Sequence, residues 1–272
     1  MNYFETDILI IGAGPGGYVA AIYAAKQGKK VVLVEKKATG GTCLNAGCIP
    51  TKALVKAADA YQMMLTANAF GIVPKEIDLD LNQLIDYKDE VKQRLVSGID
   101  FLLNKNGVRY IQAEARFLNN NEVELVGEEK QVVRAKYIII ATGSKTRHLN
   151  VEGINLANVF DAENLLNNKV LPKSLTVIGG GIIGMEFAFI YANLGVKVNV
   201  IEFMPRILPT VDRDVALRLV RYAKQLGIDI YPSSAVKKIE KNDKELRVFF
   251  ERKEALESID SEMVLEAVGR IP

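Results

Sequence analysis

The sequence predicts an α/β protein of two domains, each built on a parallel β-sheet with crossover helices and a small antiparallel meander. Two observations predict this class. A glycine-rich segment between two apolar strands occurs twice, and its second copy lies 167 residues after the first. The 272 residues also suit two domains better than one, and 49% of them are hydrophobic, which is enough for a core in each domain.

The first copy of the repeat predicts a βαβ unit, since its opening apolar run is unbroken, as in a buried parallel strand. Its elements are, in order, a strand over Asp7–Ile11, the glycines Gly12, Gly14 and Gly17, an alanine-rich helix over Val19–Gln27, and a strand over Lys30–Glu35. We expect the right-handed crossover that is usual for such units.

The second copy predicts the same unit again. Its elements are a strand over Leu175–Ile178, the glycines Gly179, Gly181 and Gly184, a helix over Ile182–Leu194, and a strand over Val196–Glu202. A single glycine pattern is weak evidence, whereas two copies with the same internal spacing indicate a duplicated architecture.

The other elements follow from periodicity and from turn residues. Between the copies we expect helices over Ala53–Phe70 and Leu81–Asn106, a meander of Val108–Ala113, Glu122–Val126 and Val132–Lys136, and a buried strand over Tyr137–Ala141. A linker near Leu149–Gly153 divides the chain into predicted domains 1–149 and 150–272. The second domain ends with a predicted helix over Asp212–Leu226 and strands near Ala235–Ile239, Leu246–Glu251 and Met263–Val268.

The glycine segments indicate dinucleotide binding by Rossmann-like domains. The first glycine permits a tight turn, the second lets a pyrophosphate approach the backbone, and the third packs helix against strand. Glu35 and Glu202 each lie 23 residues after the first glycine of their copy, where a carboxylate can accept hydrogen bonds from both ribose hydroxyls. Because an acid there repels a 2′-phosphate, Glu202 favours NAD over NADP. The alternatives are plain tight turns and solvated strand ends.

Composition excludes several classes of partner and site. The 35 basic and 33 acidic residues nearly cancel, so neither nucleic acid nor an anionic membrane is expected as a partner. The N-terminus lacks a basic segment and its apolar run is too short to span a membrane, so a cytoplasmic location is expected. Two cysteines, Cys43 and Cys48, favour a catalytic or metal-binding role in a reducing compartment. The single histidine, His148, is a hundred residues away, so no metal site is expected.

The segment GGTCLNAGCIPTK, residues 40–52, resembles the flavin disulfide reductases that carry a C-x-x-x-x-C redox pair. The motifs GAGPGG, ATGS, GGGIIGME and VGRIP extend this resemblance over nearly the whole chain, and it is strongest with the dihydrolipoamide dehydrogenases of the class I pyridine nucleotide-disulfide oxidoreductases. Glutathione and mercuric reductases share much of the pattern, but they normally use NADPH, which Glu202 disfavours. The resemblance implies FAD and NAD as cofactors, with electrons passing from dihydrolipoamide to a Cys43–Cys48 disulfide, to FAD and to NAD⁺.

The resemblance also implies roles for single residues. Cys43 would exchange with the substrate, Cys48 would lie against the flavin as the electron-transfer thiolate, and Lys52 would sit near the flavin and pair with Glu186. The implied FAD contacts are Gly12, Gly14, Pro15, Gly16, Gly17, Glu35, Gly41, Thr42, Lys52, Ala113, Thr142 and Gly143. The implied NAD contacts are Gly179, Gly181, Ile182, Ile183, Gly184, Glu202, Val236 and Gly269. The alternatives are unreactive thiols or an incidental disulfide, and a solvated lysine.

The chain departs from the family in its length. Family members continue into central and C-terminal dimerisation domains, whereas this sequence ends at Pro272 inside the V-G-R-x-P motif. We therefore expect these domains, the homodimer interface and the partner-supplied acid–base pair to be absent, and His148 to be a solvated loop residue. The implied partners are a small-molecule or lipoyl-domain dithiol and a 2-oxoacid dehydrogenase complex. A cofactor-binding module without full turnover, and another disulfide or metal-ion reductase, stay open.

Overall fold

The computed structural model describes residues 2–272, and the chain divides into two compact units that are not continuous in sequence. The first unit contains the residues up to Pro50, Asp89–Lys145 and Pro272. The second contains Thr51–Lys88 and Thr146–Ile271. The segment Thr51–Lys88, which lies between the two glycine segments in the sequence, therefore belongs to the second unit. Each unit is described by itself below.

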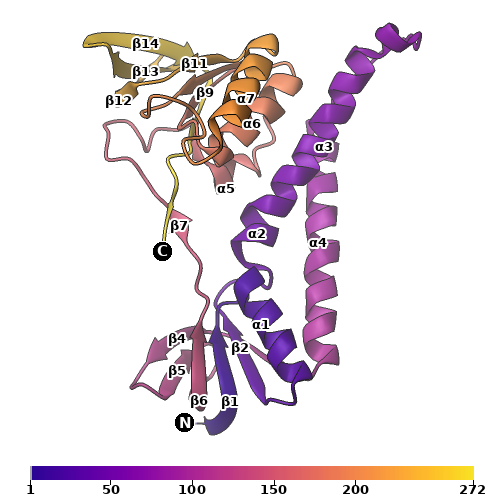
Figure 1. The fold of residues 1–272 in the computed structure, drawn as a ribbon, viewed down its shortest axis with the longest axis vertical. Coiled ribbons are helices and arrows are strands. Elements are labelled where there is room, and N and C mark those ends of the chain that lie inside the picture. Colours follow the sequence, from indigo (N-terminus) through magenta and orange to yellow (C-terminus); the bar gives the residue numbers. More distant parts are fainter. Residues whose placement is uncertain (1) are drawn as a thin grey trace. The chain divides into compact units, whose positions relative to one another are not determined.

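The first unit is built on one six-stranded sheet with the order β3-β2-β1-β6-β5-β4 (Figure 1). Its strands are β1 (Asn2–Ile11), β2 (Val31–Glu35), β3 (Arg109–Gln112), β4 (Glu114–Phe117), β5 (Glu122–Val126) and β6 (Lys130–Ile140). The four strands β3, β2, β1 and β6 are parallel, and β5 and β4 continue the sheet in antiparallel pairing. The parallel sheet and the antiparallel meander expected for this unit are thus joined in a single sheet.

Two strands of this sheet differ from the sequence-based expectation. The prediction that Val108–Ala113 belongs to the meander was wrong, because β3 pairs in parallel with β2 at the sheet edge. The strands expected separately over Val132–Lys136 and Tyr137–Ala141 form one strand, β6. From Gln131 to Ile140 it pairs with β1, which begins five residues before the predicted start at Asp7, and this long-range pairing joins the two segments.

The core of the first unit lies on both faces of the sheet, as the alternation of strand residues requires. Ile10 and Leu33 pack with Ala21 of helix α1 (Pro15–Lys26) and with Leu103 of α4 (Leu81–Lys105) on one face. A second cluster joins residues of the parallel strands and of the meander, and it contains Leu9, Val32, Val34, Val123, Leu125 and Val133. Helix α1 starts four residues before the predicted Val19, because Gly14 is its N-cap and Pro15 its first residue.

The cysteine segment is more helical than the sequence indicated. In place of one helix over Ala53–Phe70, the chain forms α2 (Gly41–Ala46), α3 (Cys48–Leu65) and the 3₁₀ helix η1 (Ala67–Phe70). The first two helix starts were not predicted, because α2 begins with glycine and α3 has cysteine and proline in its first turn. The predicted helix over Leu81–Asn106 is confirmed to within one residue as α4.

The second unit is built on a five-stranded parallel sheet with the order β11-β10-β9-β15-β8. The strands are β8 (Val159–Asp161), β9 (Ser174–Ile178), β10 (Lys197–Ile201), β11 (Asp229–Tyr231) and β15 (Met263–Glu266). The short strands β7 (Lys145–Thr146) and β16 (Arg270–Ile271) lie outside this sheet. The expected strand over Met263–Val268 lies within this parallel sheet, while β8 and β11 had no counterpart in the prediction.

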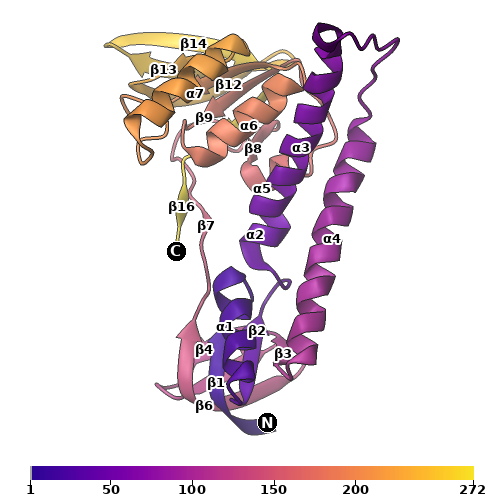
Figure 2. The ribbon, with the colours of Figure 1, turned by 45° about the vertical axis from the view of Figure 1, so that its right-hand side comes forward.

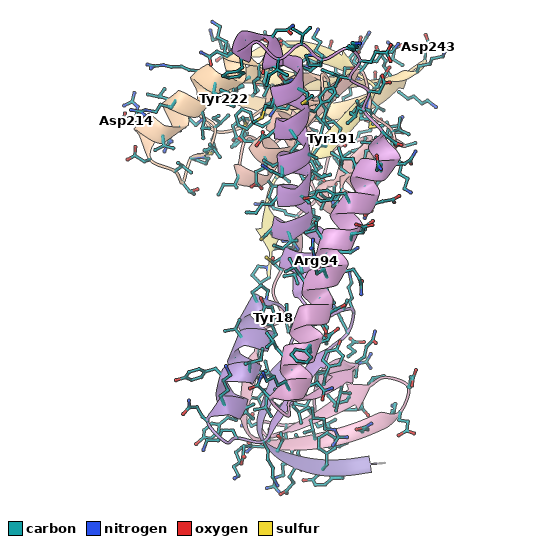
Figure 3. The ribbon with its side chains drawn as sticks, turned by 90° about the vertical axis from the view of Figure 1, so that its right-hand side faces the viewer. Tyr18, Arg94, Tyr191, Asp214, Tyr222 and Asp243 are labelled. Atoms are coloured by element: carbon teal, nitrogen blue, oxygen red, sulfur yellow. The ribbon has the colours of Figure 1, made fainter. Side chains whose placement is uncertain are left out.

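Helices and an antiparallel meander complete the second unit. Helices α6 (Ile182–Asn193) and α7 (Arg213–Gln225) lie side by side, next to the short α5 (Ala162–Leu165) (Figures 1 and 2). The meander consists of β12 (Ser234–Asn242), β13 (Glu245–Arg252) and β14 (Ala255–Ser261). Figure 3 shows Asp243 at the tip of the β12–β13 hairpin, and Tyr191 and Tyr222 on α6 and α7.

Parts of α3 and α4 complete the core of this unit. Leu54, Ala58, Leu84 and Ile85 belong to the same apolar cluster as Leu165, Leu175, Met185 and Phe187. Two polar contacts reinforce the packing: the Gln62 side chain donates to the Asn193 carbonyl at 2.8 Å, and the ammonium of the buried Lys88 donates to the Asn167 side chain at 2.9 Å. No helix within residues 2–272 is both long and apolar enough to cross a membrane.

Candidate functional site

The first and third glycines of both loops have the structural roles that the sequence predicted. Gly12 and Gly179 have φ of +103° and +109°, which only glycine adopts readily. A Cβ on Gly17 would lie 1.7 Å from the Gly12 carbonyl oxygen, and one on Gly184 would lie 1.9 Å from the Gly179 oxygen. In both copies helix and strand therefore pack too closely for any other residue.

The second glycines leave room at the two helix starts. A Cβ on Gly181 would meet nothing within 4 Å, and one on Gly14 would have only the Gly41 Cα nearby, at 3.8 Å. Both residues are N-caps, and neither helix start has a side-chain cap. The first backbone N–H groups of α1 and α6 are thus available to an anion. This arrangement fits the pyrophosphate of a dinucleotide at each loop.

The two acids hold the same contacts in both copies. Glu35 accepts hydrogen bonds from the Ala13 and Lys37 amides at 2.9 and 2.8 Å. Glu202 accepts them from the residues 167 positions later, which are the Gly180 amide at 2.5 Å and the Met204 amide at 2.6 Å. Each carboxylate thereby ties its glycine loop to the end of the second strand. A carboxylate has about four acceptor positions, so capacity is left for ribose hydroxyls.

The predicted contact residues of each unit converge at the carboxyl ends of its parallel strands. In the first unit the end of β6 touches the first glycine, since a Cβ on Gly12 would lie 3.2 Å from the Thr142 Cα. The start of α2 touches the second glycine, since a Cβ on Gly41 would lie 2.6 Å from the Gly14 Cα. The Ala113 amide donates to the Glu35 carbonyl at 3.0 Å. The residues expected to contact FAD are therefore brought together, apart from Lys52, which belongs to the second unit.

A pocket of about 500 Å³ lies beside the end of β2 in the first unit. Lys37, Thr39, Asp100, Tyr110 and Gln112 line it, together with apolar residues of α4. Burial raises the pKa of the Tyr110 phenol above its ordinary value, although a hydrogen bond with Thr39 opposes the shift. The phenol is therefore neutral at physiological pH. The pocket and Glu35 share this end of the sheet, since Lys37 and Gln112 line the pocket.

The second unit has a pocket of about 340 Å³ at the corresponding place. It lies between the end of β10 and the meander, and its lining is Phe203, Ser233, Ala235, Lys237, Glu251 and Lys253. The Lys237 ammonium and the Glu251 carboxylate form an ion pair at 2.6 Å. Val236, expected beside the NAD adenosine, lies on β12 between two of the lining residues. Gly269, the last residue expected at this site, is exposed three positions after β15 and has φ +107°.

The two cysteines occupy neighbouring helices and are in the reduced, thiol form in this structure. Cys43 is half-buried in α2, and Cys48 is exposed as the first residue of α3. The turn between the helices is tight, because a Cβ on Gly47 would lie 3.0 Å from the Thr42 carbonyl oxygen. The Asn45 side chain secures α2 by donating to the Thr39 and Gly41 carbonyls, both at 3.0 Å.

Lys52 and Glu186 lie on separate helices of the second unit. Lys52 is exposed on α3, one helical turn after Cys48, and Glu186 is half-buried on α6. Among the described residues, Lys52 and Glu186 form no ion pair in this structure. Their pairing, which the resemblance implies for the protein with its cofactors bound, stays a prediction.

One contact of the second unit was not expected from the sequence. Glu266, at the end of β15, is buried, and its carboxylate contacts His148 Nδ1 at 2.8 Å and accepts a short hydrogen bond from the Leu149 amide. His148 is exposed, as expected of a loop residue, but it is anchored rather than free. The available signal was the carboxylate itself, because an acid within the apolar run MVLEAV needs a partner.

Among the described residues no group of three or more His, Cys, Asp or Glu side chains could hold a metal ion.

Comparison with known proteins agrees with this geometry. The family profile described as pyridine nucleotide-disulphide oxidoreductase matches residues 6–272. Dihydrolipoyl dehydrogenases are similar in sequence. That of Acholeplasma laidlawii is 40% identical, over 97% of this chain and 78% of its own length. That of Geobacillus stearothermophilus is 38% identical, over 98% of this chain and 57% of its own length. The chain thus spans little more than half the length of several curated relatives.

A solved structure shows the same likeness in three dimensions. The HOCl-induced flavoprotein disulfide reductase RclA from Escherichia coli, as the Cu(II) complex of a C43S mutant, has a TM-score of 0.84 and 32% identity, covering 100% of this chain and 58% of that one. The dihydrolipoyl dehydrogenases of this family use FAD and NAD, which fits the two dinucleotide loops. The profile match and the similarity to these relatives together show that this chain belongs to the pyridine nucleotide-disulphide oxidoreductase family.

Proposed function

We propose that this chain binds FAD in the first unit and NAD in the second, and that it carries the redox dithiol of a dihydrolipoyl dehydrogenase-like enzyme. One observation carries the proposal: both glycine loops are tied to their acids by equivalent amide contacts, at Ala13 and Lys37 in one copy and at Gly180 and Met204 in the other. Two such loops in one chain support two dinucleotides. The cysteine segment follows the first loop and supports FAD there.

The chemistry of this chain's own residues is thiol–disulfide exchange. A substrate thiolate attacks the Cys43 sulfur of a Cys43–Cys48 disulfide, which breaks that bond and leaves Cys48 as a thiolate. The second substrate thiol, after losing its proton, attacks the substrate sulfur of the mixed disulfide and releases Cys43. The substrate leaves as a disulfide, and the protein pair has gained two electrons. Bound FAD would accept these electrons from the pair and pass them to NAD⁺.

The remaining elements of the activity are proposed for the whole protein. The net reaction is dithiol plus NAD⁺ to disulfide, NADH and a proton, with dihydrolipoamide or a lipoyl domain of a 2-oxoacid dehydrogenase complex as the dithiol. The proton acceptor for the exchange is part of the same proposal, and the resemblance implies that the other subunit supplies it. A homodimer and a cytoplasmic location are part of the same proposal.

The test is anaerobic reduction of the FAD-loaded, oxidised chain by dihydrolipoamide, followed by flavin absorbance. We expect the wild-type chain to lose its oxidised-flavin absorbance, and Cys43→Ser and Cys48→Ser to keep it. Glu202→Gln is the matched control, since it alters only the NAD site and should bleach like the wild type. Bleaching of Cys48→Ser at the wild-type rate would contradict the proposed electron path. A wild-type chain that binds both cofactors but is not reduced would be a binding module without turnover.

A second candidate is a metal-ion reductase of the same family, favoured by the likeness to RclA, which was solved as a Cu(II) complex. Steady-state NADH oxidation by the FAD-loaded chain distinguishes the two candidates. A higher rate with Cu(II) than with lipoamide would favour the metal-ion reductase, and the reverse order would favour the dihydrolipoyl dehydrogenase-like activity.

A further inference from the structure

One arginine makes three hydrogen bonds to the backbone of the segment between β10 and α7. The Arg206 guanidinium donates to the carbonyls of Leu208 at 3.2 Å, Val211 at 3.0 Å and Pro209 at 2.7 Å. The segment has no regular helix or strand, and the backbone of Leu208 adopts φ +50°, which is unfavourable for a residue with a side chain. Arg206 thus donates to the Pro209 and Val211 carbonyls and shares the Leu208 carbonyl with the Val211 amide, which donates to it at 3.0 Å.

The arginine-held segment closes against the second glycine loop. The Leu208 amide donates to the Gly180 carbonyl at 2.8 Å, and the Ile207 side chain is so close that a Cβ on Gly180 would lie 2.7 Å from its methyl group. The same glycine donates its amide to Glu202, which also holds the Met204 amide. Hydrogen bonds and packing therefore join the segment, the glycine loop and Glu202 to one another.

We infer that Arg206 is a positioning residue for NAD. This role rests on the proposed NAD binding. The three carbonyl contacts of Arg206 fix the segment Met204–Val211. That geometry aligns Gly180 and Glu202 for the adenosine end of the dinucleotide. Arginine suits this task because its planar fork reaches several acceptors at once, whereas lysine presents a single rotating ammonium. Three contacts commit the guanidinium, which has five N–H donors, to backbone carbonyls only four residues after Glu202.

The experiment compares Arg206→Gln and Arg206→Lys with Arg218→Gln, a control at an exposed arginine of α7 in the same unit. The dissociation constants of NADH, ADP-ribose and nicotinamide mononucleotide are measured by titration at 25 °C, after circular dichroism has shown that each variant is folded. We expect both Arg206 variants to bind NADH and ADP-ribose about tenfold more weakly, as loss of one or two net hydrogen bonds of positioning would cause. Binding of the mononucleotide, which lacks the adenosine end, and all binding to the control should stay unchanged.

Two results would overturn the inference. If Arg206→Lys binds NADH like the wild type, the positive charge rather than the carbonyl fork is what matters. If the Arg206 variants only unfold at lower temperature while the folded protein keeps its NADH affinity, Arg206 is structural and not positioning.

Failure of the proposed function gives a different result, namely a wild-type chain that does not bind NADH. Amide hydrogen exchange then decides the role of Arg206 by itself. The Met204 and Leu208 amides should exchange faster in Arg206→Gln than in the wild type and the control, and equal exchange would overturn the inference.

Discussion

The substitution Glu202→Gln tests the NAD site most sharply. Glu202 is only 6% exposed, and its two oxygens accept the Gly180 and Met204 amides at 2.5 and 2.6 Å. A glutamine keeps one carbonyl acceptor but turns its NH₂ group toward the other amide. One buried N–H then loses its partner, at a cost of about 1–3 kcal/mol. We expect the free energy of unfolding of the second unit to fall by about 2 kcal/mol.

The effect on nucleotide binding follows from the lost charge. Hydrogen bonds to an ionised group contribute about 1.5–3 kcal/mol each, so a neutral side chain beneath the ribose hydroxyls should weaken NADH binding by at least about tenfold. NADPH should lose less affinity or gain some, because the repulsion of its 2′-phosphate disappears. The ratio of the NADPH to the NADH dissociation constant should therefore fall.

The assay is titration of the chain with NADH and NADPH, followed by nucleotide fluorescence, with urea unfolding of the same samples. The matched control is Glu35→Gln, the equivalent change in the other copy, which should weaken FAD binding and leave the NADH constant as it was. NADH affinity of Glu202→Gln within twofold of the wild type would refute the reasoning. So would equal effects of the two substitutions on NADH.

Three further predictions concern other contacts of the second unit. Gly184→Ala places its methyl group 1.9 Å from the Gly179 oxygen and should destabilise the unit by about 1–3 kcal/mol in urea unfolding. Gly181→Ala has open space around its methyl group, so it should keep wild-type stability and lose NADH affinity. If both variants were equally stable, the packing role of the third glycine would be wrong. Burial raises the pKa of Tyr191 to about 12. The folded state therefore keeps a proton that the unfolded state releases above about pH 10. Through this residue, the free energy of unfolding should fall by about 1.4 kcal/mol between about pH 9 and 11. Urea unfolding should show that fall reduced in Tyr191→Phe but not in Tyr222→Phe at an exposed site, and an undiminished fall in the first variant would contradict the assignment. Glu266→Gln should accelerate hydrogen exchange of the Leu149 amide and change the ¹⁵N shift of the ring Nδ1 of His148, the one histidine of the chain, and unchanged spectra would show that the contact is absent in solution.

The features that the sequence predicted well depend on local chemistry. The spacing of three glycines and an acid determines a turn, a helix start and a strand end, and the structure repeats the amide contacts of Glu35 at Glu202. Helix α4 was predicted within one residue, because its apolar period is long and Gly107 ends it with φ +70°. Such features are determined within some 25 residues of chain.

The features that the sequence missed depend on distant partners. The strand over Arg109–Gln112 is short and amphipathic, and only its pairing with β2 places it in the parallel sheet rather than in the meander. No local pattern indicates that Leu54 and Leu84 complete the core around α6, more than a hundred residues away. The three carbonyls held by Arg206 are equally invisible in the sequence, because a backbone acceptor leaves no trace in residue identity.

The most direct test of the two-dinucleotide proposal is the binding stoichiometry of the purified chain. Calorimetric titration with FAD, followed by NADH, should give one mole of each per mole of chain. Glu35→Gln should weaken only the first event, and Glu202→Gln only the second. Binding of a single dinucleotide in total, with NADH displacing FAD from a shared site, would contradict the assignment of one cofactor to each glycine loop.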